Sequence, residues 1–179
     1  MDRAEIDAEM ARVDADFASL VGNASRSDLQ RRSSGTRWTN QQLLYHLVFG
    51  YLIVRTLLPL VRLLGRWGRS SRFAAFLNAA RRPFHVVNYL GSWMGGQIIP
   101  PAATVTLMRR TLRALQRRLE RESDHTLALT MHFPTDWDPY FRPTMTVREV
   151  YHYGTEHYEH HRRQLTLRWV GFGPDDAGA

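Results

Sequence analysis

Hydrophobic positions recur at helical spacing in four stretches of the chain. In the first stretch, apolar residues three and four apart form one stripe from Ile6 to Leu20. The second is an almost continuous apolar run, Leu43 to Leu60, which follows the capping-box sequence Thr39 to Gln42. These patterns predict two long helices, of which the second is enclosed by its neighbours.

Two further helices are predicted in the second half of the chain. Pro100-Pro101 precedes a stretch in which apolar residues alternate at three and four from Val105 to Leu119. The sequence Thr146 to Glu149 is a second capping box and starts the last long helix. No long strand pattern and no internal repeat interrupts this series. The predicted fold class is therefore all-α, a four-helix bundle.

The segments between these helices are predicted to be less regular. Gly22 to Gly35 is rich in Ser, Gly and Arg and predicts a loop. Between helices two and three we expect an extra short helix around Phe73 to Ala80 and a long connection. That connection includes Tyr89 to Gly96, which lacks the spacing of a phosphate-binding loop and predicts close packing instead. The length fits one domain, residues 1–170, with a flexible tail at 171–179.

Composition restricts the chemistry that the chain can perform. It contains no Cys, which excludes disulfides, Cys-ligated zinc, iron–sulfur clusters and cysteine nucleophiles. Any thiol chemistry must therefore use the thiol of a substrate. All 24 basic residues are Arg, as is typical of GC-rich genomes, so we expect a bacterial source. The acidic N-terminal segment does not resemble a secretory signal, and a cytoplasmic location is expected.

Charge is distributed unevenly. The segment Leu29 to Leu119 holds fifteen Arg and no acidic residue, so a surface for nucleic acid or anionic membrane is one interpretation. Arg on the outer faces of helices more often is solvated or pairs with neighbouring acids, which is the interpretation we favour. The apolar run Leu43 to Leu60 contains His46, Arg55 and Pro59, so it predicts a core helix and no membrane span. The sequence leaves open whether the protein forms a homodimer.

Three histidines are the strongest candidates for chemistry. His157 and His161 lie four apart on the last predicted helix, so their imidazoles project side by side. A single pair of this kind is weak evidence, and His46 alone would suggest a core histidine bonded to a carbonyl. Together, the three imidazoles form a metal site with coordination positions left open. Three nitrogens without a carboxylate favour zinc, while nickel, cobalt and iron(II) stay open.

Other side chains are predicted near this site. Tyr153 and Gln164 share the helix face of the histidine pair, His160 lies on its flank, and His152 points to the opposite side, where a structural role is expected. Aromatic residues that could line a substrate pocket, or belong to the core, are Tyr45, Phe49, Trp137, Tyr140 and Tyr153. No catalytic residue is identified from the sequence.

These residues resemble the pattern of the DinB superfamily over nearly the whole chain. The matching segments are Arg37-Trp38-Thr39-Asn40, then Tyr45-His46-Leu47, and the late helix from His157 to Leu165. The resemblance implies a DinB-like bundle with the metal ligands His46, His157 and His161, and with His160 and Gln164 lining the site. Relatives often carry a further His where this chain has Tyr153, so the polar lining of the pocket is expected to differ.

The resemblance also suggests a reaction. Relatives include mycothiol-dependent isomerases and bacillithiol transferases, which implies a metal-dependent thiol transferase or isomerase taking a small thiol, of the mycothiol type, and an electrophile. The nearest alternative is a hydrolase that uses a metal-bound hydroxide at the same site. Further alternatives are a non-enzymatic Arg-rich protein that binds a membrane surface or, less favoured, nucleic acid, and a metal-stabilised protein without turnover.

Overall fold

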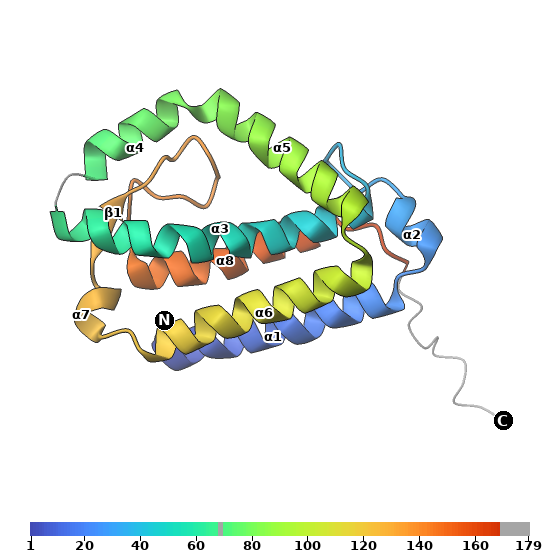
Figure 1. Ribbon diagram of the computed structural model, residues 1–179, viewed down its shortest axis with the longest axis horizontal. Helices are drawn as coiled ribbons and strands as arrows, with labels where there is room; N and C mark the ends of the chain where they lie inside the picture. Colours follow the sequence, from blue (N-terminus) through green and yellow to red (C-terminus); the bar gives the residue numbers. More distant parts are fainter. Residues whose placement is uncertain (68–69, 169–179) are drawn as a thin grey trace.

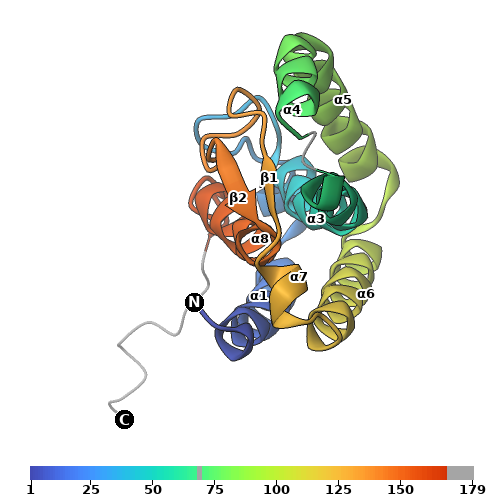
Figure 2. The same ribbon diagram turned by 90° about the vertical axis from the view of Figure 1, so that its left-hand side faces the viewer.

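Four long helices form the bundle in the computed structural model, which describes residues 1–67 and 70–168. These helices are α1 (Arg3–Asn23), α3 (Asn40–Trp67), α6 (Pro101–Glu120) and α8 (Val147–Arg162). Figure 2 shows them nearly end-on, with α4 and α5 lying outside the bundle beyond α3. The all-α class and the four helices predicted from the apolar periodicity are confirmed.

The predicted apolar stripes meet in one core. Ile6 and Phe17 of α1, Leu47 of α3 and Met108 of α6 are fully buried. Both predicted capping boxes are present. The Thr39 amide donates to Gln42 Oε1 at 3.0 Å and the Gln42 amide donates to Thr39 Oγ1 at 3.4 Å. The second box, Thr146 with Glu149, starts α8 in the same way.

Short helices and strands occupy segments between the long helices that were predicted to be less regular. The predicted loop Gly22 to Gly35 contains α2 (Arg26–Gln30), because Ser25 caps a helical turn together with Asp28. After α6, α7 (Asp124–Leu127) leads into a two-stranded antiparallel hairpin of β1 (Thr130–His132) and β2 (Thr144–Thr146). Three-residue strands are too short to leave a period-two pattern in the sequence.

The connection between α3 and α6 is the largest departure from the sequence prediction. It consists of α4 (Ser70–Ala79), at the predicted short helix, and α5 (Arg81–Ile98), which contains the supposedly irregular stretch Tyr89 to Gly96. The prediction that this connection is irregular was wrong. The predicted close packing is present. A Cβ on Gly96 would lie only 2.6 Å from the Cα of Gln42 on α3, so the glycine allows the two helices to touch.

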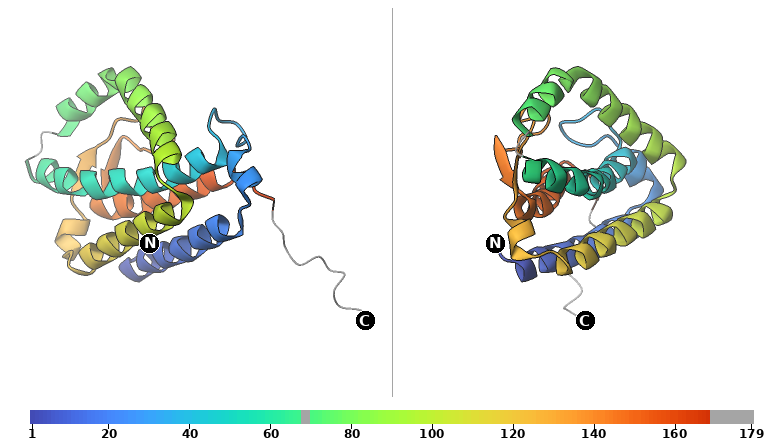
Figure 3. Two further views of the ribbon diagram at one scale, coloured as in Figure 1. Left: turned by 45° about the vertical axis from the view of Figure 1, so that its right-hand side comes forward. Right: turned by 60° about the vertical axis from the view of Figure 1, so that its left-hand side comes forward.

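Helix α5 has its apolar face toward solvent. Val86, Val87, Leu90 and Ile98 are 45–70% exposed, whereas Ser92 and Gly96 are buried against α3. A surface helix normally buries its apolar stripe. In α5 the small and polar face makes the close contact instead, and the helix crosses over α3 as an outer layer (Figures 1 and 3).

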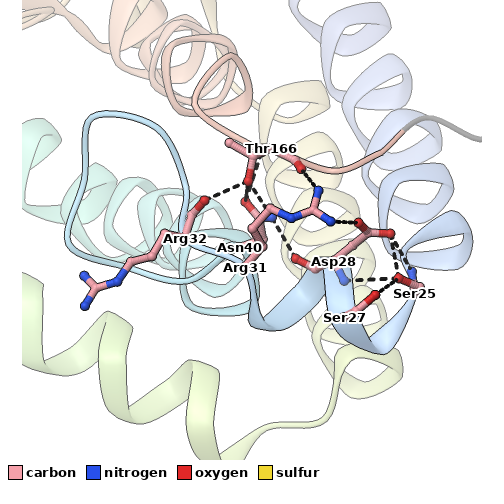
Figure 4. A network of polar contacts seen from close by, with 7 residues as sticks. All are labelled: Ser25, Ser27, Asp28, Arg31, Arg32, Asn40 and Thr166. Atoms are coloured by element: carbon pink, nitrogen blue, oxygen red, sulfur yellow. Dashed lines mark hydrogen bonds and ion pairs between the residues drawn. The ribbon is translucent and has the colours of Figure 1, made fainter.

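A buried polar network ties the start of α3 to the end of α8 (Figure 4). Asn40 is fully buried, and its side-chain nitrogen Nδ2 donates to the Asp28 backbone carbonyl at 2.8 Å and to Thr166 Oγ1 at 3.0 Å. The Asn40 side-chain carbonyl accepts the Thr166 amide at 3.0 Å. Since Thr166 lies four residues after the end of α8, these bonds fix the bundle end that carries the three histidines.

Some arginines of the basic segment pair with acids, as we expected. Arg109 on α6 contacts Asp14 on α1 at 3.2 Å. The buried carboxylate of Glu122 accepts from Arg62, lies 3.5 Å from Arg118, and receives the Tyr151 hydroxyl at 3.2 Å. A paired guanidinium is less available to a polyanion, so this part of the basic segment acts within the bundle.

Helix α3 is apolar and long enough to cross a membrane when judged by length and composition over Asn40–Leu64. Such a test is also passed by core helices of soluble proteins. Here α3 packs against α5, α6 and α8 and carries the buried His46. These contacts favour the interpretation of α3 as the central helix of the bundle.

Substituting Gly96 with Ala is expected to destabilise the protein by about 1–3 kcal/mol, because the new methyl group overpacks the backbone of Gln42. Gly22 is the matched control. It lies in α1 with nothing within 4 Å of its Cβ position, so Gly22→Ala should be neutral or stabilise by up to about 1 kcal/mol. Urea denaturation measures both, and equal effects would contradict close α5–α3 packing.

Candidate metal centre

The three predicted histidines meet where the start of α3 lies against the end of α8. His46 comes from the second turn of α3, and His157 and His161 come from the last turns of α8. One ring nitrogen from each can be chosen so that all lie within 4.8 Å of one another. The ring centroids are 4.5 to 4.9 Å apart. The structure thus brings together the set that the sequence predicted.

Two glycines permit this close approach of α3 and α8. A Cβ on Gly50 would lie 2.6 Å from Nδ1 of His157, and one on Gly154 would lie 2.6 Å from the Tyr51 ring. These distances are shorter than carbon–carbon contacts allow, so side chains at either position would push the helices apart. Gly50 in particular makes room for the ring of His157.

Hydrogen bonds orient two of the imidazoles. His46 Nδ1 lies 3.0 Å from the hydroxyl of Ser92 on α5, and His161 Nδ1 donates to Gln164 Oε1 at 2.7 Å. In both rings Nε2 is left as the nitrogen for an ion, and such outer partners fix the tautomer of a metal-binding histidine. Gln164 was predicted beside the site, whereas Ser92 was not, because α5 was not recognised as a helix.

Burial keeps the imidazoles neutral. The pKa values of His46 and His157 are well below the usual 6.5, first because of burial and then because of the neighbouring histidines. Trp38 contributes to this burial, with its ring centroid 4.5 Å from that of His46. Burial also lowers the pKa of His161, partly opposed by its hydrogen bond to Gln164. Three neutral nitrogens are the ligand form that zinc and related divalent ions bind, so the residues fit such an ion.

A carboxylate that sequence reasoning missed lies beside the cluster. Asp138 Oδ2 is 4.0 Å from His157 Nε2 and accepts the hydroxyl of Tyr153 at 2.9 Å, while Oδ1 accepts the Tyr140 amide at 2.9 Å. Burial, with the charge and hydrogen bond of Asp138, raises the pKa of Tyr153 well above its usual 10. Tyr153 therefore stays a donor. Asp138 lies in an aperiodic loop, and no sequence pattern marks its orientation.

Two cavities of different character flank the histidines. A small one of about 30 Å³ touches His46, His157, Asp138 and Tyr153 and has apolar walls that include Trp137. Further along α8, an open cavity of about 470 Å³ is lined by Gly35, Thr36, Arg37, Trp38, Tyr89, His161 and Gln164. The small cavity therefore gives access to His46 and His157, and the open one to His161.

His160 flanks the cluster as predicted, with its ring centroid 4.8 Å from that of His161, while the other predicted residues lie farther away. The Tyr140 hydroxyl bonds to His160 Nδ1 at 3.1 Å, and both line a separate cavity with His152. His152 contacts Glu9 of α1 at 2.9 Å, in agreement with the predicted structural role. Tyr45 packs against Gly95 of α5 and does not line either cavity beside the histidines.

Replacement of His46, His157 or His161 with Ala should each reduce the affinity for zinc by more than the ~10–100-fold that loss of an orienting partner costs. The reason is that each removes one of three nitrogens around the same point. Metal content of the purified, untagged protein measures the effect. His152→Ala is the control and should retain the metal, whereas retention by all three cluster variants would eliminate this site.

Stability of the metal-free protein should fall as pH drops below about 6.5. Since the folded-state pKa values of His46 and His157 lie below the usual 6.5, the unfolded chain takes up protons first. The contribution of neutral imidazoles is therefore present above pH 6.5 and is lost as pH falls. Urea midpoints between pH 8 and 5 measure this. His157→Gln should show a shallower decline, and an unchanged slope would contradict buried neutral histidines.

Comparisons with curated proteins and with solved structures each gave no match. The model of the DinB superfamily matches residues 9–165, which include most of α1, the other three bundle helices and the three clustered histidines. The chain therefore belongs to the DinB superfamily.

Proposed function

We propose that this protein is a metal-dependent enzyme that activates a low-molecular-weight thiol of the mycothiol type. The activated thiol is either transferred to a small electrophile or promotes the isomerisation of that electrophile. One observation carries the proposal: three neutral imidazoles, two buried and one half-buried, converge beside two cavities in a chain that has no thiol of its own. Zinc is the favoured ion, with nickel, cobalt and iron(II) as alternatives.

His46, His157 and His161 would hold the ion, while Ser92 and Gln164 keep two of the rings in place. A divalent ion, when bound, supplies the positive charge that lowers the pKa of an incoming thiol. Three protein ligands would leave a coordination position for a substrate. The protein's own contribution is to hold the imidazoles neutral and converging.

The open cavity beside His161 suits a polar thiol. Arg37 and Gln164 line it, and a guanidinium and an amide can bind the hydroxyl, carbonyl or carboxylate groups that such thiols carry. Trp38 and Tyr89 are stacked at 5.9 Å and form its aromatic wall. The thiol's sulfur would reach the cluster past His161, which borders this cavity.

Asp138 is our candidate for the proton acceptor. It borders the small cavity opposite, and Tyr153 and the Tyr140 amide hold its carboxylate in position. In the addition step, the thiol sulfur forms a bond to an electrophilic carbon, the thiol proton passes to Asp138, and Asp138 returns that proton to the adduct. If the new carbon–sulfur bond is kept in the product, the enzyme is a transferase. If that bond later breaks and the thiol is released, the enzyme is an isomerase.

Hydrolysis at the same site is the second candidate. Water would replace the thiol, and Asp138 would take its proton, so the position of this carboxylate also suits an ester or amide substrate. A role as a polyanion-binding protein is less supported, because Arg62, Arg109 and Arg118 pair with acids within the bundle.

The visible spectrum of cobalt-loaded protein should change when mycothiol or a cysteine analogue is added, and the protein should accelerate attack of that thiol on a small unsaturated carbonyl compound. Absorbance titration and the rate of thiol loss measure the two effects. An unchanged spectrum, together with hydrolysis of a test ester, would replace the transferase proposal with the hydrolase.

Two variants of the loop separate binding from proton transfer in the same experiment. Asp138→Asn should keep the metal and the spectral response but lower the rate by about 10²-fold or more, as expected for a lost general base. Asp136→Asn, two residues earlier and exposed, should keep both. Equal rates for the two variants would exclude Asp138 from the reaction.

A further inference from the structure

A second apolar space adjoins the small cavity at the histidines. This groove has a volume of about 300 Å³ and lies between the outer face of α3, the first half of α5 and Trp137. Its lining is formed by Phe49, Leu52, Ile53, Thr56 and Leu57 of α3, Phe84 and Val87 of α5, and Trp137. Thr56 is the single polar side chain among the residues that line it.

The groove and the cavity at the histidines share a wall. Ile53, Leu57, Phe84 and Trp137 line both spaces. Trp137 stacks on Phe84 with centroids 3.8 Å apart and is anchored by its Nε1–H, which donates to the Leu77 carbonyl at 2.7 Å. The groove and the small cavity at His46 and His157 therefore adjoin each other along these side chains.

The chemistry of this wall selects an apolar occupant. A charged or strongly polar chain would lose hydration in the groove without gaining partners, whereas each buried methylene is worth about 0.8 kcal/mol. The volume is at the lower end of the ~300–1,000 Å³ typical of small-molecule sites. The cavity on the other side of the cluster carries Arg37 and Gln164 and offers polar partners.

We infer that the groove between α3 and α5 is a binding site for the alkyl or aryl chain of the electrophilic substrate, whose reactive group enters the adjoining small cavity at the histidines. The inference rests on the proposed function for the identity of the substrate, but not for the binding itself. The enzyme is accordingly selective for electrophiles that carry an apolar chain, and the polar thiol enters from the opposite side.

Binding is tested on metal-free and metal-loaded protein without thiol or turnover. The probe is the neutral fluorophore N-phenyl-1-naphthylamine, displaced by a series of primary alcohols from hexanol to decanol. Fluorescence should rise on binding, and competitor affinity should increase by up to about fourfold per added methylene, which is the 0.8 kcal/mol of a buried methylene expressed as a ratio. The affinity should be the same with and without metal.

Two neighbouring valines of α5 give a matched pair of variants. Val87 lines the groove and Val86 does not, and both are more than half exposed, so neither substitution disturbs the core. Val87→Glu should weaken probe binding at least tenfold, while Val86→Glu should change it less than twofold. Thr56→Glu, on the α3 wall, should reproduce the loss seen with Val87→Glu.

The outcomes separate this inference from the proposed function. Absence of probe binding, or equal loss in the Val86 and Val87 variants, would overturn the groove as a ligand site even if the metal and thiol experiments succeed. Conversion of a dimer to a monomer by either variant, with probe binding lost in parallel, would mean that a second copy of the chain occupies the groove and would also overturn the inference. Probe binding that is intact and sensitive to Val87→Glu supports the site even if no thiol chemistry is found.

Discussion

The site depends on how closely α3 and α8 can approach. His46 and the His157–His161 pair come from opposite ends of the sequence, and they meet only because Gly50 and Gly154 leave no side chain where the two helices touch. The buried Asn40 then fixes the register of these helix ends through Asp28 and Thr166. Backbone contact and one polar network thus set the positions of all three imidazoles.

The same packing determines the charge state of the cluster. Helices this close exclude water, and Trp38 covers His46 from the side, so protonated imidazolium is disfavoured at each ring. Three neutral imidazoles, with one ring nitrogen of each within 4.8 Å of the others, form a ligand set suited to a single cation. A divalent ion satisfies all three nitrogens at once, which is the physical reason to connect this fold with metal chemistry.

The hydrophobic periodicity of the sequence predicted those features that depend only on regular helix geometry. The stripe from Ile6 to Leu20, the caps at Thr39 and Thr146, and the spacing of His157 and His161 are local patterns, and the structure contains each of them. The pairing of His46 with the other two followed from the residue types and from family resemblance. The assignment of one domain over residues 1–170 with a tail stays a prediction, and residues 169–179 lie outside the described part of the chain.

Features that depend on tertiary contacts were not accessible from the sequence. Asp138 reaches the site because Trp137 of the same loop contacts α4 and α5, and because the hydroxyl of Tyr153 on α8 donates to the Asp138 carboxylate. A loop without periodicity gives no sequence signal for such a position. Helix α5 was missed because the aromatic, glycine-rich stretch Tyr89 to Gly96 is typical of an irregular segment. In the structure these glycines permit contact with α3.

The orientation of α5 gives the two sides of the cluster their different character. Its small and polar face supplies Ser92 to His46, while its N-terminal half presents Phe84 and Val87 to the outer face of α3. Had α5 buried a conventional apolar stripe, those side chains would fill the space that is now the groove. A helix that packs through glycine and serine therefore positions a metal-site partner and leaves an apolar approach open beside it. The same element thereby connects the geometry of the site with the selectivity that we propose for it.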